Sequence, residues 1–258
     1  MRVALVLALT LAAASVHAEI VAKAVPYQDG DADLVGFLTY DSAKSSAPGV
    51  LVVPQWMGLT EYEKGRARQL AELGYVAFCA DIYGNGLVAK DAQEAGALAG
   101  KFRGGDRALF RSRVNAALKA LKASPTVDAR RCGAIGYCFG GTGVLELARS
   151  GADVLGVVSF HGGLDSPSPA DGKNVKGKVL VLHGADDPFT PKAEIAAMEK
   201  ELKDAGVDYQ LVFYSGAVHA FTQPMAGNDP SRGAAYHEKA DKRSWRAMRD
   251  FFEEVFGR

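Results

Sequence analysis

The chain has 258 residues, and its 30 lysine and arginine residues balance 30 aspartate and glutamate residues. Because no long run of either sign is present, it is a poor candidate for binding nucleic acid or an anionic membrane surface. Its three cysteines, Cys79, Cys132 and Cys138, are too few for a disulfide scaffold, although a Cys79–Cys132 bridge is left open. No spacing among the histidines, cysteines and acidic residues resembles a metal site, so no metal is expected.

The first eighteen residues have the pattern of a secretory signal peptide. Arg2 supplies a positive start, Val3–Ala14 is almost wholly apolar, and Val16-His17-Ala18 places small residues where a signal peptidase cuts. A retained membrane anchor is the alternative, but the apolar run is shorter than the roughly 20 residues that span a bilayer. We therefore expect cleavage near Ala18, a single domain over residues 19–258, a periplasmic or secreted location and no stable membrane insertion.

The mature chain begins with two strand-like segments and continues as alternating strands and helices. Glu19–Tyr27 and Leu34–Tyr40, joined by a turn at residues 28–31, predict a hairpin at the edge of a sheet. Short runs that are apolar on both faces follow, as in a parallel sheet covered by helices. They are Gly49–Val53, Tyr75–Ala80, Cys132–Gly136, Val154–Phe160, Lys178–His183 and Tyr209–Tyr214.

Helical spacing of apolar residues lies between these strands. The segments are Glu61–Leu73, Asp106–Ala123, Lys192–Ala205 and Ala234–Phe256. The alternation predicts one open, doubly wound α/β sheet. Ile82–Gly105 falls where such sheets carry a cap over the site, and Asp165–Gly177 is expected to be a surface excursion or lid.

The strongest local motif is Gly136-Tyr137-Cys138-Phe139-Gly140-Gly141, between a predicted strand and a helix over Thr142–Arg149. This is the setting of a nucleophile elbow, in which only glycine fits on either side of the nucleophile. The amino end of the helix also favours a thiolate at Cys138. A glycine-rich turn around a buried cysteine is one alternative. A dinucleotide-binding loop is another, but it needs glycine where Cys138 stands.

Candidate partners for Cys138 follow later strands in the order acid, then histidine. Asp187 comes shortly after Lys178–His183, although Asp186 serves turn chemistry equally well, and His219 lies in the loop after Tyr209–Tyr214. In this arrangement Cys138 attacks a carbonyl carbon, His219 moves the proton, and Asp187 orients the imidazole.

The oxyanion of such a reaction needs two backbone donors. We expect one from the N–H of Phe139, the residue after the nucleophile, and one from the loop around Gln55-Trp56. His161 also follows a strand end and is predicted to line the pocket. His183 is expected to pack within its strand end, and His237 to be exposed on the last helix.

Several motifs together resemble the dienelactone hydrolase family over nearly all of the mature chain. They are Pro54-Gln55-Trp56-Met57-Gly58, Gly74-Tyr75, Asp81-Ile82-Tyr83-Gly84, the Cys138 motif, Gly184-Ala185-Asp186-Asp187-Pro188-Phe189 and His219-Ala220-Phe221. The resemblance implies an α/β-hydrolase fold, a Cys138–Asp187–His219 triad that opens enol-lactones, no cofactor, and a monomer, with a dimer left open.

Three positions depart from the family's pattern. Gln55 stands where family enzymes carry a glutamate that interacts with the resting thiol. Asn85 and Gln223 stand where the family's prototype holds its substrate's carboxylate with two arginines, and neutral amides make weaker contacts there. Gln55, Asn85 and Gln223 are therefore predicted substrate-binding residues of an enzyme that prefers uncharged esters or lactones.

Two other functions compete with ester hydrolysis. A non-catalytic binding or stress-related protein could keep the fold, but it would not need the three residues of the triad. A redox role for Cys138 lacks the Cys-x-x-Cys pair that usually supports it. The sequence thus predicts an exported cysteine hydrolase of small-molecule esters or lactones.

Overall fold

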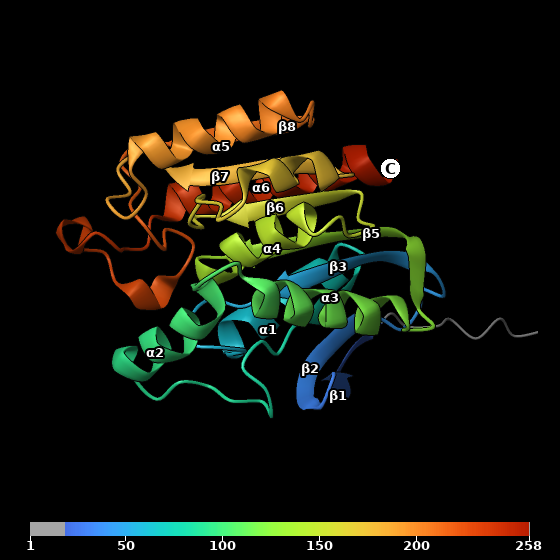
Figure 1. The fold of residues 1–258 in the computed structure, drawn as a ribbon. Coiled ribbons are helices and arrows are strands. Elements are labelled where there is room, and N and C mark those ends of the chain that lie inside the picture. Colours follow the sequence, from blue (N-terminus) through green and yellow to red (C-terminus); the bar gives the residue numbers. More distant parts are fainter. Residues whose placement is uncertain (1–18, 258) are drawn as a thin grey trace, which may run out of the picture.

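The computed structural model describes residues 19–257, so the predicted signal peptide lies outside the described residues. Eight strands form one sheet in the order β1-β2-β4-β3-β5-β6-β7-β8 (Figure 1). The strands are β1 (Ile20–Asp29), β2 (Ala32–Asp41), β3 (Ala47–Val53), β4 (Val76–Cys79), β5 (Val127–Tyr137), β6 (Gly156–Phe160), β7 (Lys178–Gly184) and β8 (Tyr209–Tyr214).

The sheet is antiparallel at one edge and parallel elsewhere. Strands β1 and β2 form the predicted hairpin, and β2 pairs with β4 in antiparallel register. Every other neighbouring pair, from β4 to β8, is parallel. The predicted fold, a doubly wound and mostly parallel sheet with an edge hairpin, is confirmed.

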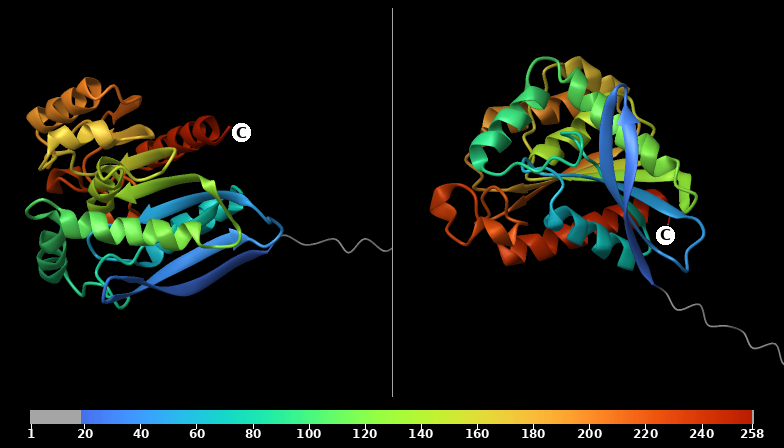
Figure 2. Two further views of the ribbon diagram at one scale, coloured as in Figure 1. Left: turned by 45° about the vertical axis from the view of Figure 1, so that its right-hand side comes forward. Right: turned by 90° about the horizontal axis from the view of Figure 1, so that it is seen from below.

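Helices cover both faces of the sheet, as Figure 2 shows from two sides. One face packs against α1 (Glu61–Glu72) and α6 (Glu238–Phe256), and the other against α3 (Ala108–Lys122), α4 (Phe139–Arg149) and α5 (Lys192–Asp204). All residues of β3, β4 and β6 are buried, because helices remove water from both of their faces. Since helices cover both faces, the carboxyl ends of the parallel strands are where a ligand site is expected in a sheet of this kind.

The disulfide left open by the sequence does not form, and the topology gives the reason. Cys79 and Cys132 are both free and buried. They lie on β4 and β5, which are separated by β3, and they pack into the cores on opposite faces of the sheet. Two strand spacings amount to roughly 9–10 Å, more than the ~7 Å that a disulfide can span between Cα atoms.

The two predicted excursions take different forms. Residues 82–105 include a helix that the sequence pattern did not reveal, α2 (Ala92–Arg103), which packs against α3. Residues 165–177 form the short 3₁₀ helix η1 (Pro169–Asn174) against α4 and α5. The second segment is therefore a surface excursion and does not cover the open ends of the strands.

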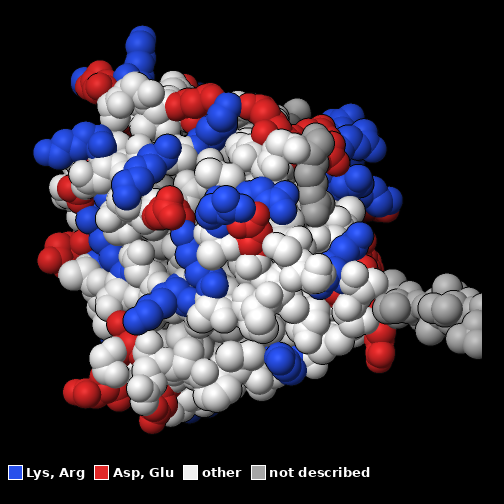
Figure 3. All heavy atoms as spheres, turned by 90° about the vertical axis from the view of Figure 1, so that its right-hand side faces the viewer, with Lys and Arg blue, Asp and Glu red and all other residues white. Residues whose placement is uncertain are grey.

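Helix α6 begins four residues later than predicted, at Glu238, because His237 caps it by accepting the N–H of Ala240. His237 is therefore partly buried, where the sequence predicted an exposed side chain. No helix within residues 19–257 is long and apolar enough to cross a membrane. On the face shown in Figure 3, Lys and Arg side chains are interspersed with Asp and Glu.

Candidate active site

Cys138 lies at the sharp turn between β5 and α4. Its backbone has a positive φ of 55°, which is strained for a residue with a side chain. A Cβ on Gly136 would lie 1.9 Å from the carbonyl oxygen of Gly140, and a Cβ on Gly140 would lie 2.1 Å from that of Val53. The two glycines flanking the cysteine are therefore required by backbone packing, as in a nucleophile elbow.

The structure brings the three predicted triad residues together from three loops. His219 Nε2 lies 3.0 Å from Cys138 Sγ, and His219 Nδ1 lies 2.9 Å from Asp187 Oδ2. The carboxylate of Asp187 is fully buried, and its Oδ1 accepts the N–H of Phe189 at 2.9 Å. An imidazole that contacts a thiol on one side and a buried carboxylate on the other can accept the thiol's proton, and the carboxylate then stabilises the resulting imidazolium.

A β-like contact fixes the loop that carries His219. The N–H of His219 donates to the carbonyl of Gly233, and the N–H of Ala235 donates to the carbonyl of His219. The segment just before α6 thus pairs with the histidine loop as an isolated parallel bridge. The sequence predicted helix from Ala234, and the difference arises because these residues extend to hold His219.

The electrostatics of the cluster favour a thiolate–imidazolium pair. Burial alone raises the pKa of Cys138, but the facing His219 and the N–H of Phe139 outweigh it, so the thiol pKa is lowered. Burial alone lowers the pKa of His219, but Cys138 and Asp187 raise it to about 10. By contrast, burial raises the pKa of Cys132 to about 11. Cys138 is therefore the more reactive thiol.

The Gln55-Trp56 loop is held over the elbow by a buried carboxyl. The N–H of Gln55 donates to Glu63 Oε1 at 3.3 Å, while Glu63 Oε2 accepts the N–H and the hydroxyl of Thr60. Tyr83 donates its hydroxyl to the carbonyl of Trp56 at 2.6 Å. The loop that is expected to supply the second oxyanion donor is thus held by hydrogen bonds to Glu63 of α1 and to Tyr83.

A cavity of about 660 Å³ opens above Cys138 and His219. Three predicted residues line it, namely Gln55, Trp56 and Gln223. The side-chain nitrogens of both glutamines are buried and have no hydrogen-bond partner among the described residues. The remaining wall includes Met57, Arg103, Gly163, Phe189, Ala220, Met225, Ala226, Arg232 and Ala234.

Two predicted substrate-binding residues do not reach this cavity. Asn85 is exposed in a turn with φ of 53°, where its N–H donates to the carbonyl of Asp33 on the hairpin side. His161 is fully buried, with its Nε2 2.7 Å from the hydroxyl of Thr222 and its ring edge-to-face with His219. His161 therefore packs against the imidazole of His219 and does not line the pocket.

The sequence reasoning missed two kinds of residue. Glu63 had a readable signal, because Thr60-x-x-Glu63 before an apolar periodic segment is a capping box. Phe189 reaches the cavity from a turn, and Met225 and Arg232 reach it from two short 3₁₀ helices, whose paths no local pattern reveals.

A known protein family matches most of the chain. The model of the dienelactone hydrolase family matches residues 35–256. The chain belongs to the dienelactone hydrolase family. This confirms the resemblance that the sequence motifs indicated.

Solved structures of the family agree closely with this fold. The structure titled m3DLH is 43% identical, with a TM-score of 0.88 over 92% of this chain and 99% of that one. A dienelactone hydrolase-like promiscuous phosphotriesterase, P91, from metagenomic libraries is 41% identical, with a TM-score of 0.85 over 92% and 98%. Among curated relatives, a probable 2-oxo-3-(5-oxofuran-2-ylidene)propanoate lactonase of Bradyrhizobium sp. is 31% identical over 67% of this chain and 73% of its own.

Proposed function

We propose that this dienelactone hydrolase family member cleaves small carboxylic esters or lactones through an acyl-cysteine at Cys138. The observation that carries the proposal is the chain of contacts from Sγ to His219 at 3.0 Å and from His219 to Asp187 at 2.9 Å, at the floor of an open cavity. A non-catalytic binding protein would have no use for a thiol of lowered pKa in this setting.

The reaction follows from the positions of these groups. The thiolate of Cys138 adds to the carbonyl carbon, and the N–H of Phe139 and a donor of the Gln55-Trp56 loop stabilise the oxyanion. The carbon–oxygen bond breaks, and His219 gives its proton to the departing alkoxide, which stays attached when the substrate is a lactone. Water, deprotonated by His219, then cleaves the thioester and restores the thiolate.

Trapping of the acyl-enzyme tests the proposal directly. A chromogenic acetate ester should give a burst of product equal to the enzyme concentration, and peptide mass spectrometry should find one acetyl group on Cys138. Cys132 serves as the internal control, because burial raises its pKa to about 11 and should leave it unmodified. Turnover without a burst, or a burst with acetyl elsewhere, contradicts the proposal.

The substrate should carry no charge near the scissile bond. Gln55 and Gln223 present amides to the cavity, and Arg103 is already paired with Asp165 at 3.0 Å. Arg232 also lines the cavity, but its side chain is exposed to solvent, so a carboxylate held beside the two amides would lose hydration without gaining a buried bidentate partner, at a cost of ~1.5–3 kcal/mol for each missing charged hydrogen bond. We expect kcat/KM for a methyl ester to exceed that of the matched acid by about tenfold or more. A preference for the acid would contradict this.

A second candidate activity is the hydrolysis of phosphotriesters. It is supported by the 41% identity to a protein described as a promiscuous phosphotriesterase. The same thiolate would attack phosphorus in place of carbon. A p-nitrophenyl phosphotriester assayed with wild type and Cys138→Ala tests it, since activity that survives in the variant would not arise at this site.

We also propose that the protein is exported. The proposal is supported by the sequence of residues 1–18 alone, with Arg2 followed by an apolar run and by Val16-His17-Ala18. Amino-terminal sequencing of the protein from its native host should begin at or near Glu19. An intact Met1 on the accumulated protein would contradict it.

A further inference from the structure

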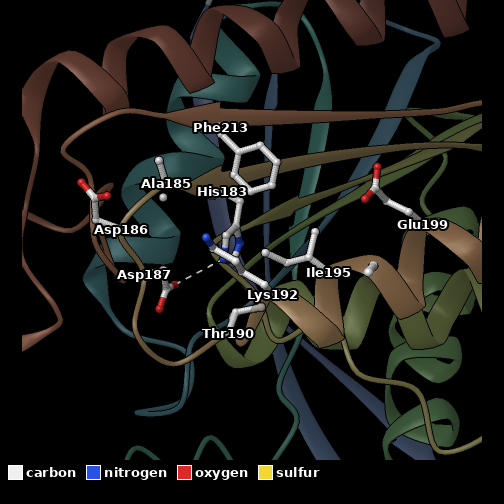
Figure 4. A pocket seen from close by; sticks show the side chains of 11 residues that line it. His183, Ala185, Asp186, Asp187, Thr190, Lys192, Ile195, Glu199 and Phe213 are labelled. Carbon is white, nitrogen blue, oxygen red and sulfur yellow. Dashed lines mark ion pairs between the residues drawn. The ribbon is translucent and has the colours of Figure 1, made fainter.

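A second cavity, of about 470 Å³, has Asp187 in its wall but neither Cys138 nor His219 (Figure 4). It opens between the ends of β7 and β8 and the start of α5. Its wall includes Thr190, Lys192, Ile195, Glu199 and Phe213, together with the turn Gly184–Asp187. At its inner end lies the imidazole of His183, which the ester chemistry described above does not use.

His183 is a buried imidazole without a hydrogen bond. Its side chain is 1% exposed, and neither ring nitrogen has a partner among the described residues. Its ring packs edge-to-face on Phe213, with centroids 6.1 Å apart. Burial holds the pKa of His183 below its ordinary value, although the nearby Asp187 opposes this lowering, so the ring is neutral and carries one N–H. A buried N–H without an acceptor costs free energy.

A carboxylate oxygen lies just beyond hydrogen-bond distance of His183, on the residue that also contacts His219. Nε2 of His183 lies 3.7 Å from Asp187 Oδ2, the contact drawn as a dashed line in Figure 4. Oδ2 also contacts His219 Nδ1 at 2.9 Å. The two imidazoles therefore face the same oxygen, and the remaining oxygen, Oδ1, is taken by the N–H of Phe189.

We infer that His183 is a positioning residue that donates its Nε2–H to Oδ2 of Asp187 and so holds the carboxylate in line with His219. A movement of less than an ångström shortens the present contact to a hydrogen bond. Asp187 then has three donors and cannot rotate about its Cβ–Cγ bond when the charge on His219 changes during turnover. The inference deepens the proposed thiol chemistry and rests on it.

The expected effect of losing this donor follows from its partner's charge. A hydrogen bond to an ionised group contributes ~1.5–3 kcal/mol, and 1.4 kcal/mol is tenfold in rate. The present distance is long, so we expect the lower end of that range. Since His183 does not line the substrate cavity, its loss should lower kcat about tenfold and leave KM unchanged.

Two substitutions separate donation from packing. His183→Phe keeps a ring against Phe213 but has no donor, whereas His183→Gln places an amide N–H close to the position of Nε2. We expect kcat per active site, counted by the acylation burst, to fall about tenfold in His183→Phe and clearly less in His183→Gln. Phe213→Ala loosens the same cavity without touching Asp187 and should stay near wild type.

Chemical rescue provides a test that does not depend on either replacement. His183→Ala enlarges a cavity that is already open to solvent, and added imidazole can then occupy the vacated position. Imidazole should restore kcat in His183→Ala and leave wild type unchanged, after subtraction of the rate measured with Cys138→Ala. Rescue to within about threefold of wild type would support donation.

The outcomes distinguish this inference from the function on which it rests. Absence of an acylation burst in wild type would overturn the proposed function itself. A normal burst with His183→Phe at the wild-type kcat would overturn only the role of His183. Equal losses in His183→Phe, His183→Gln and Phe213→Ala, or no rescue by imidazole, would assign the effect to packing and would also overturn it.

Discussion

The floor and the rim of the substrate cavity are built in different ways. At the floor, Cys138 is fixed by backbone contacts so close that neither Gly136 nor Gly140 can accept a Cβ. At the rim, Phe189 and Met225 are 60% and 73% exposed and extend from a turn and a short 3₁₀ helix. Gly136 and Gly140 at the floor therefore cannot be replaced without a backbone clash, whereas Phe189 and Met225 at the rim can be replaced without disturbing the fold. Under the proposed function, backbone packing would fix the position of the nucleophile, and the exposed side chains at the rim would select the substrate.

The largest effect should follow from removing the sulfur at the floor. Cys138→Ala leaves His219 without a nucleophile to activate, so hydrolysis of an activated ester should fall by at least about 10³-fold. Cys132→Ala, the matched control in the strand that precedes the elbow, removes a buried thiol and should retain most of the turnover. Steady-state assays of both purified variants check this, and appreciable turnover by Cys138→Ala would end the triad assignment.

The next effect tests whether the floor depends on glycine as the geometry requires. Gly140→Ala would place a Cβ 2.1 Å from the carbonyl oxygen of Val53, a clash with backbone that no side chain can relieve. We expect a loss of about 3 kcal/mol in the free energy of unfolding, and little activity. Gly96→Ala in α2 meets nothing within 4 Å and should stabilise the protein by about 0.5–1 kcal/mol. Urea unfolding of both variants measures the contrast, which equal midpoints would refute.

A third test concerns the charge above the floor. The lowered pKa of Cys138 means that thiolate persists below the pH at which a free cysteine, with a pKa of ~8.5, becomes protonated. Gln55→Glu adds a carboxylate to the cavity and disfavours a second negative charge, which should raise the pKa of Cys138. Iodoacetamide should therefore label wild type readily below the pH at which a free cysteine is protonated, and label Gln55→Glu about tenfold more slowly there.

Gln55→Met is the matched control for that test, because it changes the side chain at the same position without adding charge. Its alkylation rate should follow wild type from about pH 5 to 9. A wild-type rate that rises only above about pH 8, or equal slowing by both substitutions, would show that charge at position 55 does not govern the thiol.

The residues at the floor of the cavity could be predicted from the sequence, whereas the residues at its rim could not. Gly136, Cys138 and Gly140 lie within one strand-to-helix turn, so the constraint that selects them acts between near neighbours and is visible in the sequence. Asp187 and His219 each follow a strand, and parallel strands bring their carboxyl ends together, so their meeting could also be predicted. The mostly parallel, doubly wound sheet and its edge hairpin could likewise be predicted from apolar patterning and a turn signal, whereas the order of the strands was not predicted.

The wrongly predicted and missed features depend on the path of the chain between distant segments, which no local sequence pattern encodes. Asn85 was assigned to the pocket by its place in a motif, but a turn with positive φ directs it towards the hairpin. His161 was assigned to the pocket by its position after a strand, but a contact with Thr222, 61 residues away, draws it into the core. Helix α2 was missed because alanine and glycine fill much of it, and they give little apolar periodicity.

The smallest effect should come from the rim, and it sharpens the contrast with the floor. Phe189 packs edge-to-face on His219 and leaves much of its ring exposed, and Met225 lines the same cavity. A substrate with a long acyl or aryl group would cover these side chains, and burial of about 40 Å² of apolar surface contributes roughly 1 kcal/mol. Met225→Ala should therefore lower kcat/KM for a hexanoate ester by about fivefold while leaving the acetate ester near wild type. Leu109→Ala removes another exposed apolar side chain, from α3 and outside the cavity wall, and should change neither. An equal loss for acetate and hexanoate in Met225→Ala would mean that the rim supports the catalytic groups and does not select the substrate.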